Sequence, residues 1–271
     1  MDILAFIEWA VKPEIISKPI EVRWYGLLFA LGFFIGQSLM TKIYKQEGKP
    51  ESGVDSLTIY VLIATVLGAR LGHCLFYDPD YYLAHPVEIL MVWKGGLASH
   101  GAAIGILIGL WMYSRKFNYH FLWVVDRVVI MVALGGAFIR LGNLMNSEIV
   151  GIPTDVPWAF IFERLGDNTP RHPVQLYESL TYFATFAILW GMYKKFGTSL
   201  AHGRLFGVFL IMVFGSRIIW EMFKVHQAGF MEGVDLRMGQ LLSIPLVLAG
   251  LYLLFKSNKG DTVEQEKTKI G

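Results

Sequence analysis

The sequence predicts an all-α, polytopic membrane protein with seven transmembrane helices. Of its 271 residues, 54% are hydrophobic and only 17% are charged, whereas a soluble domain carries roughly 25% charged residues. The mean hydropathy is +0.47. The high apolar content excludes a disordered or collagen-like chain. It also argues against a soluble enzyme, because a single core of this size cannot bury so many apolar side chains.

Charge and cysteine content exclude several other classes. The net charge of +2 is too small to indicate nucleic-acid binding. Cys74 is the one cysteine, so there is no intramolecular disulfide or CxxC metal site, and we interpret it as a small buried residue. The histidines show no HxxH or HExxH spacing, and no metal is expected.

Seven stretches approach the length of about 20 mostly apolar residues that a helix needs to cross a bilayer. They are residues 24–41, 56–77, 95–114, 121–143, 174–193, 205–223 and 238–255. Asp126 and Arg127 lie at one end of the fourth stretch, and we interpret them as a structural pair.

The loops between these stretches predict an orientation. Loops on one side carry twelve Lys and Arg residues and those on the other carry eight, and the richer side is expected to be cytoplasmic. The N-terminus is then outside and the C-terminus cytoplasmic. Residues 1–271 form a single integral membrane domain, with an outer-surface segment at 1–23, an extracytoplasmic loop at 144–173 and a cytoplasmic tail at 257–271.

The two terminal segments have their own patterns. Apolar residues in segment 1–23 recur at helical spacing, which predicts an amphipathic helix on the membrane surface rather than a cleaved signal peptide. These residues are Ile3, Leu4, Phe6, Ile7 and Ala10. The polar tail is expected to be disordered.

Charged residues inside a membrane are functional candidates, because each costs about 2.5–3.5 kcal/mol to insert. Arg70, Arg140 and Arg217 all fall in the outer half of their stretches. Tyr25 and His100 begin the first and third stretches on the same side. This clustering predicts a polar, largely basic cavity that opens to the extracytoplasmic side.

The segment that ends the fourth stretch, residues 140–148, reads RLGNLMNSE. Arg140, Asn143 and Asn146 are spaced by three and share a face if the helix continues. A guanidinium with two carboxamides suits phosphate oxygens. The alternative is that Gly142 and Asn143 simply end the helix.

A second polar segment, residues 170–178, reads PRHPVQLYE. Pro173 suits the first turn of the fifth helix, and Gln175 and Glu178 face one way on it. The alternative is an ordinary polar interface with a capping box.

His100, Arg217 and Glu221 also have structural alternatives. A lone histidine at a membrane boundary can be a packed, hydrogen-bonded residue, and Arg217 and Glu221 can form an intrahelical pair. Glycines spaced by four after His100 allow another helix or a lipid chain to come close. They are Gly101, Gly105 and Gly109.

Several short blocks, in order along the chain, together resemble one known family. They are residues 23–26 (RWYG), 68–72 (GARLG), 93–101 (WKGGLASHG), 140–148 with Gly151, 171–178, 214–217 (FGSR) with Glu221, and 238–240 (MGQ). On these blocks the chain resembles the bacterial prolipoprotein diacylglyceryl transferases. Ala102 and Val174 depart from the usual Gly and Ser or Thr, and neither change removes a group needed for chemistry.

The resemblance implies an enzyme, a transferase that acts in the first step of bacterial lipoprotein maturation. It would transfer the diacylglyceryl group of phosphatidylglycerol to the lipobox cysteine of a prolipoprotein signal peptide. A thioether forms and glycerol phosphate leaves, with no cofactor and no metal. The resemblance also implies the bacterial plasma (inner) membrane, an active site facing its extracytoplasmic side, and seven spans.

Within that activity we assign roles as hypotheses. Arg140 and Arg217 hold the phosphate, and His100 is the general base, with Tyr25 orienting it or the lipid. The other expected substrate-binding residues are Arg70, Asn143, Asn146, Glu148, Gly151, His172, Gln175, Glu178 and Glu221. Glu148 and Glu221 are expected to hold the arginines, and Arg70 and His172 either touch substrate or brace the cavity.

Two other functions make different demands on the sequence. A transporter or lipid flippase would use the same basic cavity but needs polar positions near the midplane and on both sides, often with internal repeats. An intramembrane protease would need a Gly-x-Ser-x-Gly motif, paired intramembrane aspartates or HExxH. The one-sided polar cluster and the missing motifs favour neither.

Overall fold

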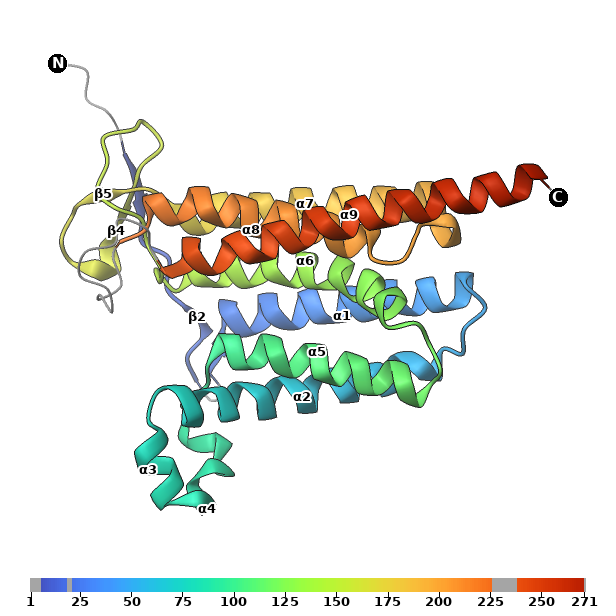
Figure 1. Ribbon diagram of the computed structural model, residues 1–271. Coiled ribbons are helices and arrows are strands. Elements are labelled where there is room, and N and C mark those ends of the chain that lie inside the picture. The colour runs from blue at the N-terminus through green and yellow to red at the C-terminus, as the bar shows by residue number, and fades with distance from the viewer. Residues whose placement is uncertain (1–5, 19–20, 226–237, 271) are drawn as a thin grey trace. The chain divides into compact units, whose positions relative to one another are not determined.

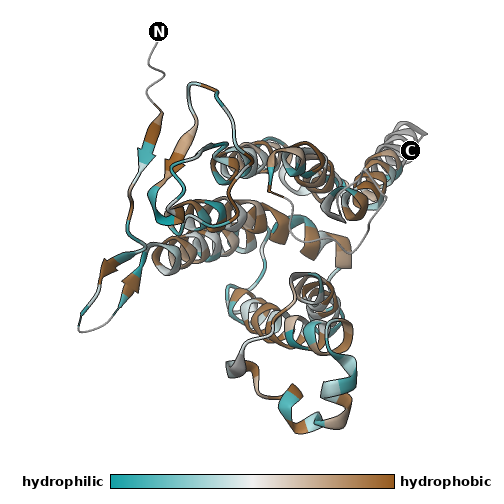
Figure 2. Ribbon diagram, turned by 90° about the vertical axis from the view of Figure 1, so that its left-hand side faces the viewer, coloured by the Kyte–Doolittle hydropathy of each residue, from teal (hydrophilic) through white to brown (hydrophobic). Residues whose placement is uncertain are grey.

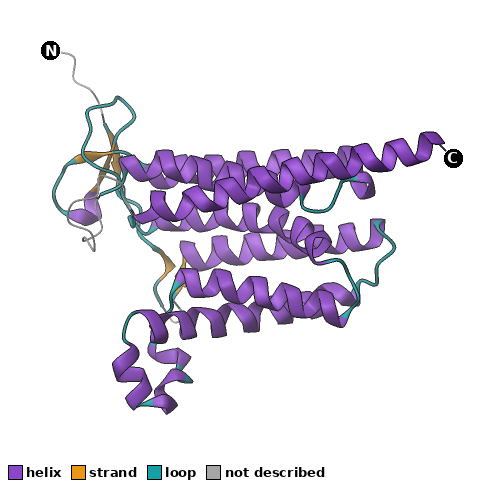
Figure 3. Ribbon diagram, in the orientation of Figure 1, coloured by secondary structure: helices purple, strands orange, loops and turns teal. Residues whose placement is uncertain are grey.

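The structure is a computed structural model that describes residues 6–18, 21–225 and 238–270 (Figure 1). It is 72% helical, and a long helix occupies each of the seven apolar stretches (Figure 3). These helices are α1 (Trp24–Gln46), α2 (Ser52–Phe76), α5 (Ser99–Lys116), α6 (Phe121–Met145), α7 (Val174–Phe196), α8 (Arg204–Trp220) and α9 (Met238–Ile270). A mainly helical protein is therefore confirmed.

Among the described residues, five helical segments are long and apolar enough to cross a membrane. They are α1, α2, α6, Arg204–Phe223 and Gly239–Lys256. Hydrophobic residues, drawn in brown in Figure 2, recur along the helices. Many large apolar side chains on the helices are exposed, among them Phe34, Ile63 and Leu251. Exposed apolar faces of this extent are typical of helices that contact lipid, and the chain is a multi-pass membrane protein.

The chain divides into two compact units. Unit 1 comprises Met1–Leu39 and Asp126–Gly271, and unit 2 comprises Met40–Val125. In unit 1, α8 packs against both α7 and α9. A Cβ built on Gly207 of α8 would lie 2.9 Å from the carbonyl oxygen of Gly250 of α9. Only glycine allows the two backbones to approach so closely.

Asp126 shows why a charge can lie at one end of α6. Its side chain is fully buried, and its two carboxylate oxygens accept hydrogen bonds from the backbone N–H groups of Gly203 (2.7 Å) and Phe206 (2.8 Å). The carboxylate therefore satisfies otherwise unpaired N–H groups at the start of α8. Arg127 lies 4.0 Å from it, so the predicted structural pair is confirmed.

Unit 1 also contains a small sheet outside the long helices. Strands β1 (Ile7–Trp9), β4 (Phe160–Phe162) and β5 (Pro170–Arg171) pair in that order, with β1 parallel to β4 and β4 antiparallel to β5. Trp9 and Val150 cover a core of Leu144, Phe160 and Phe162. The segment between β4 and β5 includes the 3-10 helix η2 (Glu163–Leu165).

The helix predicted within residues 1–23 is wrong. Besides β1, the segment forms an antiparallel pair of strands, β2 (Glu14–Ile16) and β3 (Val22–Arg23). Pro13 cannot donate a helical hydrogen bond, and its carbonyl instead accepts one from Trp24 N at 2.9 Å. Residues 1–5, which include two of the five apolar positions, lie outside the described residues.

Unit 2 is built on a very close pair of helices, α2 and α5. Built Cβ atoms on Gly68 and Gly101 would lie 2.4 and 2.3 Å from each other's carbonyl oxygens. The expectation that a helix packs against these glycines is therefore confirmed. Cys74 on α2 is fully buried, as expected. Between the helices the chain forms α3 (Pro79–Ala84), α4 (Pro86–Ile89) and the 3-10 helix η1 (Val92–Lys94).

The C-terminal tail differs from expectation. Helix α9 continues through residues 257–270, so the expected disorder is not what the structure has. The tail is rich in Glu, Gln and Lys, which favour helix when a preceding helix supplies the nucleus. Two further 3-10 turns, η3 (Gly197–Ser199) and η4 (Glu221–Phe223), flank α8.

Candidate active site

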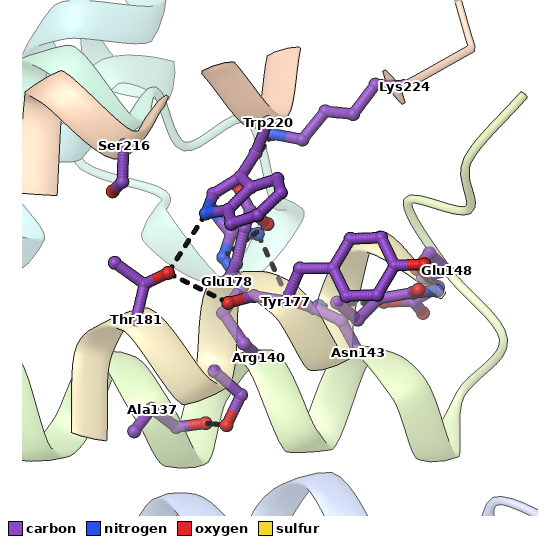
Figure 4. Close-up of polar contacts among 12 residues, drawn as sticks. Ala137, Arg140, Asn143, Glu148, Tyr177, Glu178, Thr181, Ser216, Trp220 and Lys224 are labelled. Atoms are coloured by element: carbon purple, nitrogen blue, oxygen red, sulfur yellow. Dashed lines mark hydrogen bonds and ion pairs between the residues drawn. The ribbon is translucent and has the colours of Figure 1, made fainter. Parts of the chain in front are cut away.

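The candidate active site lies in unit 1, where α6 ends, α7 begins and α8 ends (Figure 4). Arg140 of α6, Glu178 of α7 and Arg217 of α8 line one small pocket of about 10 Å³. Its remaining lining residues are Tyr182, Val213, Ser216 and Trp220. The structure therefore brings together two of the four predicted catalytic residues.

Arg140 is held by side chains on two helices. Its Nε lies 3.0 Å from Glu178 Oε2, and its Nη1 donates to Asn143 Oδ1 at 3.3 Å. The contact with Glu178 is ionic and not an aligned hydrogen bond, because Oε2 has no hydrogen-bond partner among the described residues. The side chain of Arg140 is 18% exposed. The guanidinium is thus held in place by these contacts and stays partly accessible.

Lys224 supplies a third cation that the sequence did not single out. It follows α8 and is buried, with Nζ 2.8 Å from Glu178 Oε1 and 3.1 Å from Glu221 Oε2. Glu178 therefore lies between two cations, Arg140 and Lys224. Glu221 pairs with this lysine, and the expectation that it holds an arginine stays a prediction.

Arg217 is exposed and faces the same pocket. Within residues 6–18, 21–225 and 238–270, its guanidinium has no hydrogen bond or ion pair. The predicted alternative of an intrahelical Arg217–Glu221 pair is thus wrong, because α8 ends at Trp220 and Glu221 begins the 3-10 turn η4.

The charges that line this pocket are mainly positive. Two guanidinium groups, those of Arg140 and Arg217, and one carboxylate, that of Glu178, line it. A partly buried pocket with more positive than negative groups favours an anionic ligand. A forked guanidinium without a partner is the group that proteins commonly use for phosphate oxygens.

The two predicted asparagines lie beside Arg140 and meet at one carboxylate. Asn143 Nδ2 and Asn146 Nδ2 donate to the two oxygens of Glu148, at 3.3 and 3.1 Å. Glu148 therefore orients two amides, and within the described part of the chain it makes no ion pair with an arginine, contrary to expectation. Helix α6 ends at Met145, so the chain turns before Asn146, yet Glu148 keeps both amides in one group.

The end of α6 is shaped by close contacts and by unusual backbone. A Cβ on Gly142 would lie 2.6 Å from Tyr25 Cδ2, so the aromatic ring rests directly on this glycine. Ser147 and Ile149 have φ of 54° and 56°, a conformation that is costly for a β-branched residue such as Ile. The structure places predicted Tyr25 next to the Arg140 segment.

Gly151 and Gln175 hold the segment that follows. Gln175 is fully buried and donates from Nε2 to the carbonyl of Glu148 at 2.6 Å. A Cβ on Gly151 would lie 2.4 Å from the carbonyl oxygen of His172, so glycine is required there. Both predicted residues therefore shape the backbone around Glu148.

His172 is hydrogen-bonded to an aromatic neighbour. Tyr177 OH accepts a hydrogen bond from Trp158 Nε1 at 2.8 Å and lies 3.2 Å from His172 Nδ1. The Tyr177 hydroxyl and His172 Nδ1 share a hydrogen bond whose direction follows the imidazole tautomer. Burial lowers the pKa of His172, which favours its neutral form.

His100 and Arg70 belong to unit 2. His100 is exposed, and its Nε2 lies 3.1 Å from Tyr77 OH, with the two rings stacked at 6.1 Å. The stacking on Tyr77 matches the packed, hydrogen-bonded alternative for this histidine, while the exposure leaves the ring accessible.

The guanidinium of Arg70 is engaged by main-chain carbonyls. It donates to Ile89 O (3.0 Å), Gly95 O (2.6 Å) and Glu88 O (2.5 Å), and the side chain is 2% exposed. These contacts tie α4 and the turn after η1 to α2. Of the two roles left open for Arg70, this geometry supports bracing.

Sequence reasoning missed Lys224, Tyr177 and Tyr182. Lys224 falls three residues after Glu221, a spacing that suggests a pair, but it lies beyond the last apolar residue and was counted as a loop charge. Tyr182 carries no local signal, because it lines the pocket with residues of other helices. Tyr177 lies close in sequence to its partner His172, but its other partner, Trp158, comes from the preceding loop.

Taken together, fold and site define a multi-pass membrane protein with a partly buried cationic site at one end of a helix bundle. A family model described as prolipoprotein diacylglyceryl transferase matches residues 13–256, and the chain belongs to this family.

Individual relatives match over nearly the whole chain. The chain is 51% identical over 267 residues to the phosphatidylglycerol–prolipoprotein diacylglyceryl transferase of Chloroherpeton thalassium, covering 98% of this chain and 99% of that protein. It is 51% identical over 253 residues to the enzyme of the same name from Tolumonas auensis (93% and 97% covered). The identity is 44% over 283 residues for that of Porphyromonas gingivalis (98% and 99% covered).

Proposed function

We propose that the polar cluster of unit 1 binds the head group of phosphatidylglycerol in the reaction of this family, the transfer of a diacylglyceryl group to a prolipoprotein. One observation carries the proposal: Arg217, which has no partner among the described residues, lines the same pocket as Arg140. A phosphodiester carries one negative charge, which suits a pocket lined by two guanidinium groups.

The reaction makes a thioether from a thiol. The cysteine sulfur forms a bond to the glyceryl carbon, the bond from that carbon to the phosphate oxygen breaks, and the thiol proton passes to a base. A free thiol has a pKa of about 8.5, so a base or a positive field is needed. The departing glycerol phosphate gains negative charge, and Arg140 and Arg217 would stabilise it in the transition state.

Other residues would shape the head-group pocket. We assign Asn143 and Asn146 to the polar part of the lipid, oriented by Glu148. We assign Gln175 and Gly151 to the backbone around it. Glu178 and Glu221 would fix the cations, which is supported by their ion pairs with Arg140 and Lys224.

We assign the proton transfer to His100. Its exposed ring and the hydrogen bond with Tyr77 support a base that can reach solvent or substrate. We assign Tyr25 to orienting the lipid, because its ring rests on Gly142 of the Arg140 segment. His172 would brace the rim of the site, and Arg70 would brace the loop of unit 2.

We infer that all seven long helices cross the membrane, and the strand pairing supports this number. Because β1 pairs with β4, residues 7–9 and 160–162 lie on one side of the membrane. The chain between them must therefore cross an even number of times. Helices α1, α2 and α6 qualify as spans, which supports α5 as the fourth, since α3 and α4 are too short.

The same argument applies to α7. Ile152 N donates to the carbonyl of Phe223 at 2.8 Å, so these residues also share a side. Between them lie α7 and α8, and α8 with η4 qualifies as a span, so α7 crosses too. With α9 the count is seven, and the excess of Lys and Arg on the other side orients the N-terminus and the site outward.

This topology supports a location in a bacterial membrane. We propose the bacterial plasma (inner) membrane, with the site facing the extracytoplasmic side. The partners are phosphatidylglycerol and a prolipoprotein signal peptide whose lipobox cysteine is the acceptor. Residues 1–271 would form one integral membrane domain, with 1–23 and 144–173 outside and 257–271 in the cytoplasm.

The test uses purified protein in detergent, phosphatidylglycerol labelled in an acyl chain, and a synthetic lipobox peptide with a free cysteine. We expect label on the peptide and release of glycerol phosphate. Arg140→Ala should lower transfer by about 10²–10³-fold, whereas Arg115→Ala, an exposed arginine at the end of α5, should leave it unchanged. Transfer that persists in Arg140→Ala would contradict the site, and a folded wild-type protein without transfer would contradict the function.

A further inference from the structure

We propose that Lys224 is a positioning residue that keeps the guanidinium of Arg140 free to bind phosphate. This inference rests on the proposed function. Neither the sequence motifs nor the family assignment gives Lys224 a role, and it does not line the pocket itself. Its contact with substrate-binding Arg140 is indirect, through Glu178.

The geometry divides Glu178 between two cations. Oε1 of Glu178 lies 2.8 Å from Lys224 Nζ, and Oε2 lies 3.0 Å from Arg140 Nε. The Glu178 side chain is only 5% exposed and that of Lys224 is 10% exposed. Each carboxylate oxygen thus lies next to a different cation, and the side chains of Glu178 and Lys224 are shielded from most of the solvent.

Sharing the carboxylate changes what Arg140 can do. An arginine alone with a carboxylate prefers a forked pair, in which two of its nitrogens bond to the two oxygens. Here Lys224 takes Oε1, and Oε2 makes no aligned hydrogen bond. Nη1 of Arg140 is used by Asn143, and its Nη2 has no hydrogen bond among the described residues. Nη2 is the donor that an incoming phosphate oxygen can take.

The surrounding backbone holds Lys224 in place. Gly151 forms an antiparallel bridge with Lys224, and Glu221 Oε2 accepts from its Nζ at 3.1 Å. Glu221 in turn lies against Gly239, where a Cβ would come within 2.8 Å of the carboxyl carbon. A buried ammonium is costly unless it is paired, and the carboxylates of Glu178 and Glu221 supply that pairing.

A purely structural role makes a different prediction. If Lys224 only neutralised Glu178, its loss would lower stability without changing lipid affinity. If it keeps Arg140 free, its loss lets Glu178 form the forked pair with Arg140. Lipid binding then weakens, and removing the Glu178 charge as well should restore part of it.

The experiment measures KM for phosphatidylglycerol, kcat and melting temperature in detergent. The variants are Lys224→Met, Lys224→Arg, Glu178→Gln and the double variant Lys224→Met/Glu178→Gln. Lys116→Met, an exposed lysine at the end of α5, is the control. Lys224→Gln keeps a donor without the charge and replaces Lys224→Met if that variant does not fold.

We expect Lys224→Met to raise KM by about tenfold with a smaller change in kcat. Lys224→Arg should stay close to the wild type, and the double variant should have a lower KM than Lys224→Met. An unchanged KM in Lys224→Met, or a double variant that is as impaired as Lys224→Met or worse, would overturn the inference.

Direct binding separates this inference from the proposed function. Binding of phosphatidylglycerol to each detergent-purified variant is measured by native mass spectrometry, without peptide. A wild-type protein that binds the lipid but transfers nothing would contradict the function alone, and a weaker affinity in Lys224→Met would still support the role of Lys224. Equal affinity in wild type and Lys224→Met would overturn that role whatever the transfer assay gives.

Discussion

Arg70 in unit 2 and Arg140 in unit 1 are both arginines inside apolar helices. Arg70 is bonded to main-chain carbonyls, whereas Arg140 contacts side chains. Arg70 is 2% exposed and donates to the main-chain carbonyls of residues 88, 89 and 95. Arg140 is 18% exposed and contacts the side chains of Glu178 and Asn143.

This difference shows how the use of an intramembrane arginine can be recognised. Main-chain carbonyls cannot leave without moving the backbone, so an arginine bonded to several of them holds a loop in place. Side-chain partners that leave one nitrogen unbonded keep a donor for a ligand. Position in the sequence did not separate the two residues, because both fall in the outer half of an apolar stretch.

Replacing Arg70 tests the comparison with the largest expected effect on stability. Arg70→Gln removes charge-assisted hydrogen bonds to several main-chain carbonyls, and we expect a loss of about 2–4 kcal/mol in the free energy of unfolding. The melting temperature in detergent would show it. In Arg140→Gln the ion pair of Glu178 with Lys224 remains, so transfer should be lost with a much smaller drop. An Arg70→Gln protein with a normal melting temperature and no transfer would break the comparison.

The close helix pair of unit 2 provides a second, smaller test. Gly101→Ala places a Cβ 2.3 Å from the carbonyl oxygen of Gly68, so α2 and α5 must separate. We expect a loss of about 1–3 kcal/mol, seen as a lower melting temperature. Gly215→Ala in α8 is the control, because nothing lies within 4 Å of its built Cβ. Equal melting temperatures for the two variants would contradict the tight packing.

The smallest effect is expected at the exposed edge of unit 1. The Arg171 guanidinium bonded to Asp167 holds the pKa of that carboxyl below its usual range. A lowered folded-state pKa stabilises the protein above the unfolded value of about 3.9, and this contribution is lost as pH falls through the folded pKa.

Asp167→Asn should therefore lower the melting temperature slightly at neutral pH, because exposed ion pairs contribute little. The difference from the wild type should vanish at acidic pH. Melting curves across the pH range check this, and a difference that grows on acidification would contradict it. Such a slight change in melting temperature would sharpen the contrast with the larger loss expected for Arg70→Gln.

Hydropathy predicts the long helices well, because membrane insertion selects for apolar runs. It fails for residues 7–9, which form β1: their apolar spacing fits a helix, but the strand partner Phe160–Phe162 lies about 150 residues away. No local pattern contains that pairing.

The contacts of the candidate site divide in the same way: sequence spacing predicts those within one helix but not those between distant segments. Arg140 and Asn143 are neighbours on one helix, and their spacing predicts the contact. The pairs that Glu178 makes with Arg140 and Lys224 join three segments of the chain. Spacing within one element cannot predict them, and for the same reason it did not predict that Glu148 accepts from two amides.

The carboxylate of Asp126 has a consequence for how the chain is synthesised. Its amide donor at Gly203 lies 77 residues further along. When α6 has just been synthesised, that donor has not yet been made, and Arg127 is the charge nearest along the chain. The hydrogen bonds of Asp126, near the start of α6, can form only after the start of α8 has been made. We therefore expect unit 1 to assemble fully only once α8 is present.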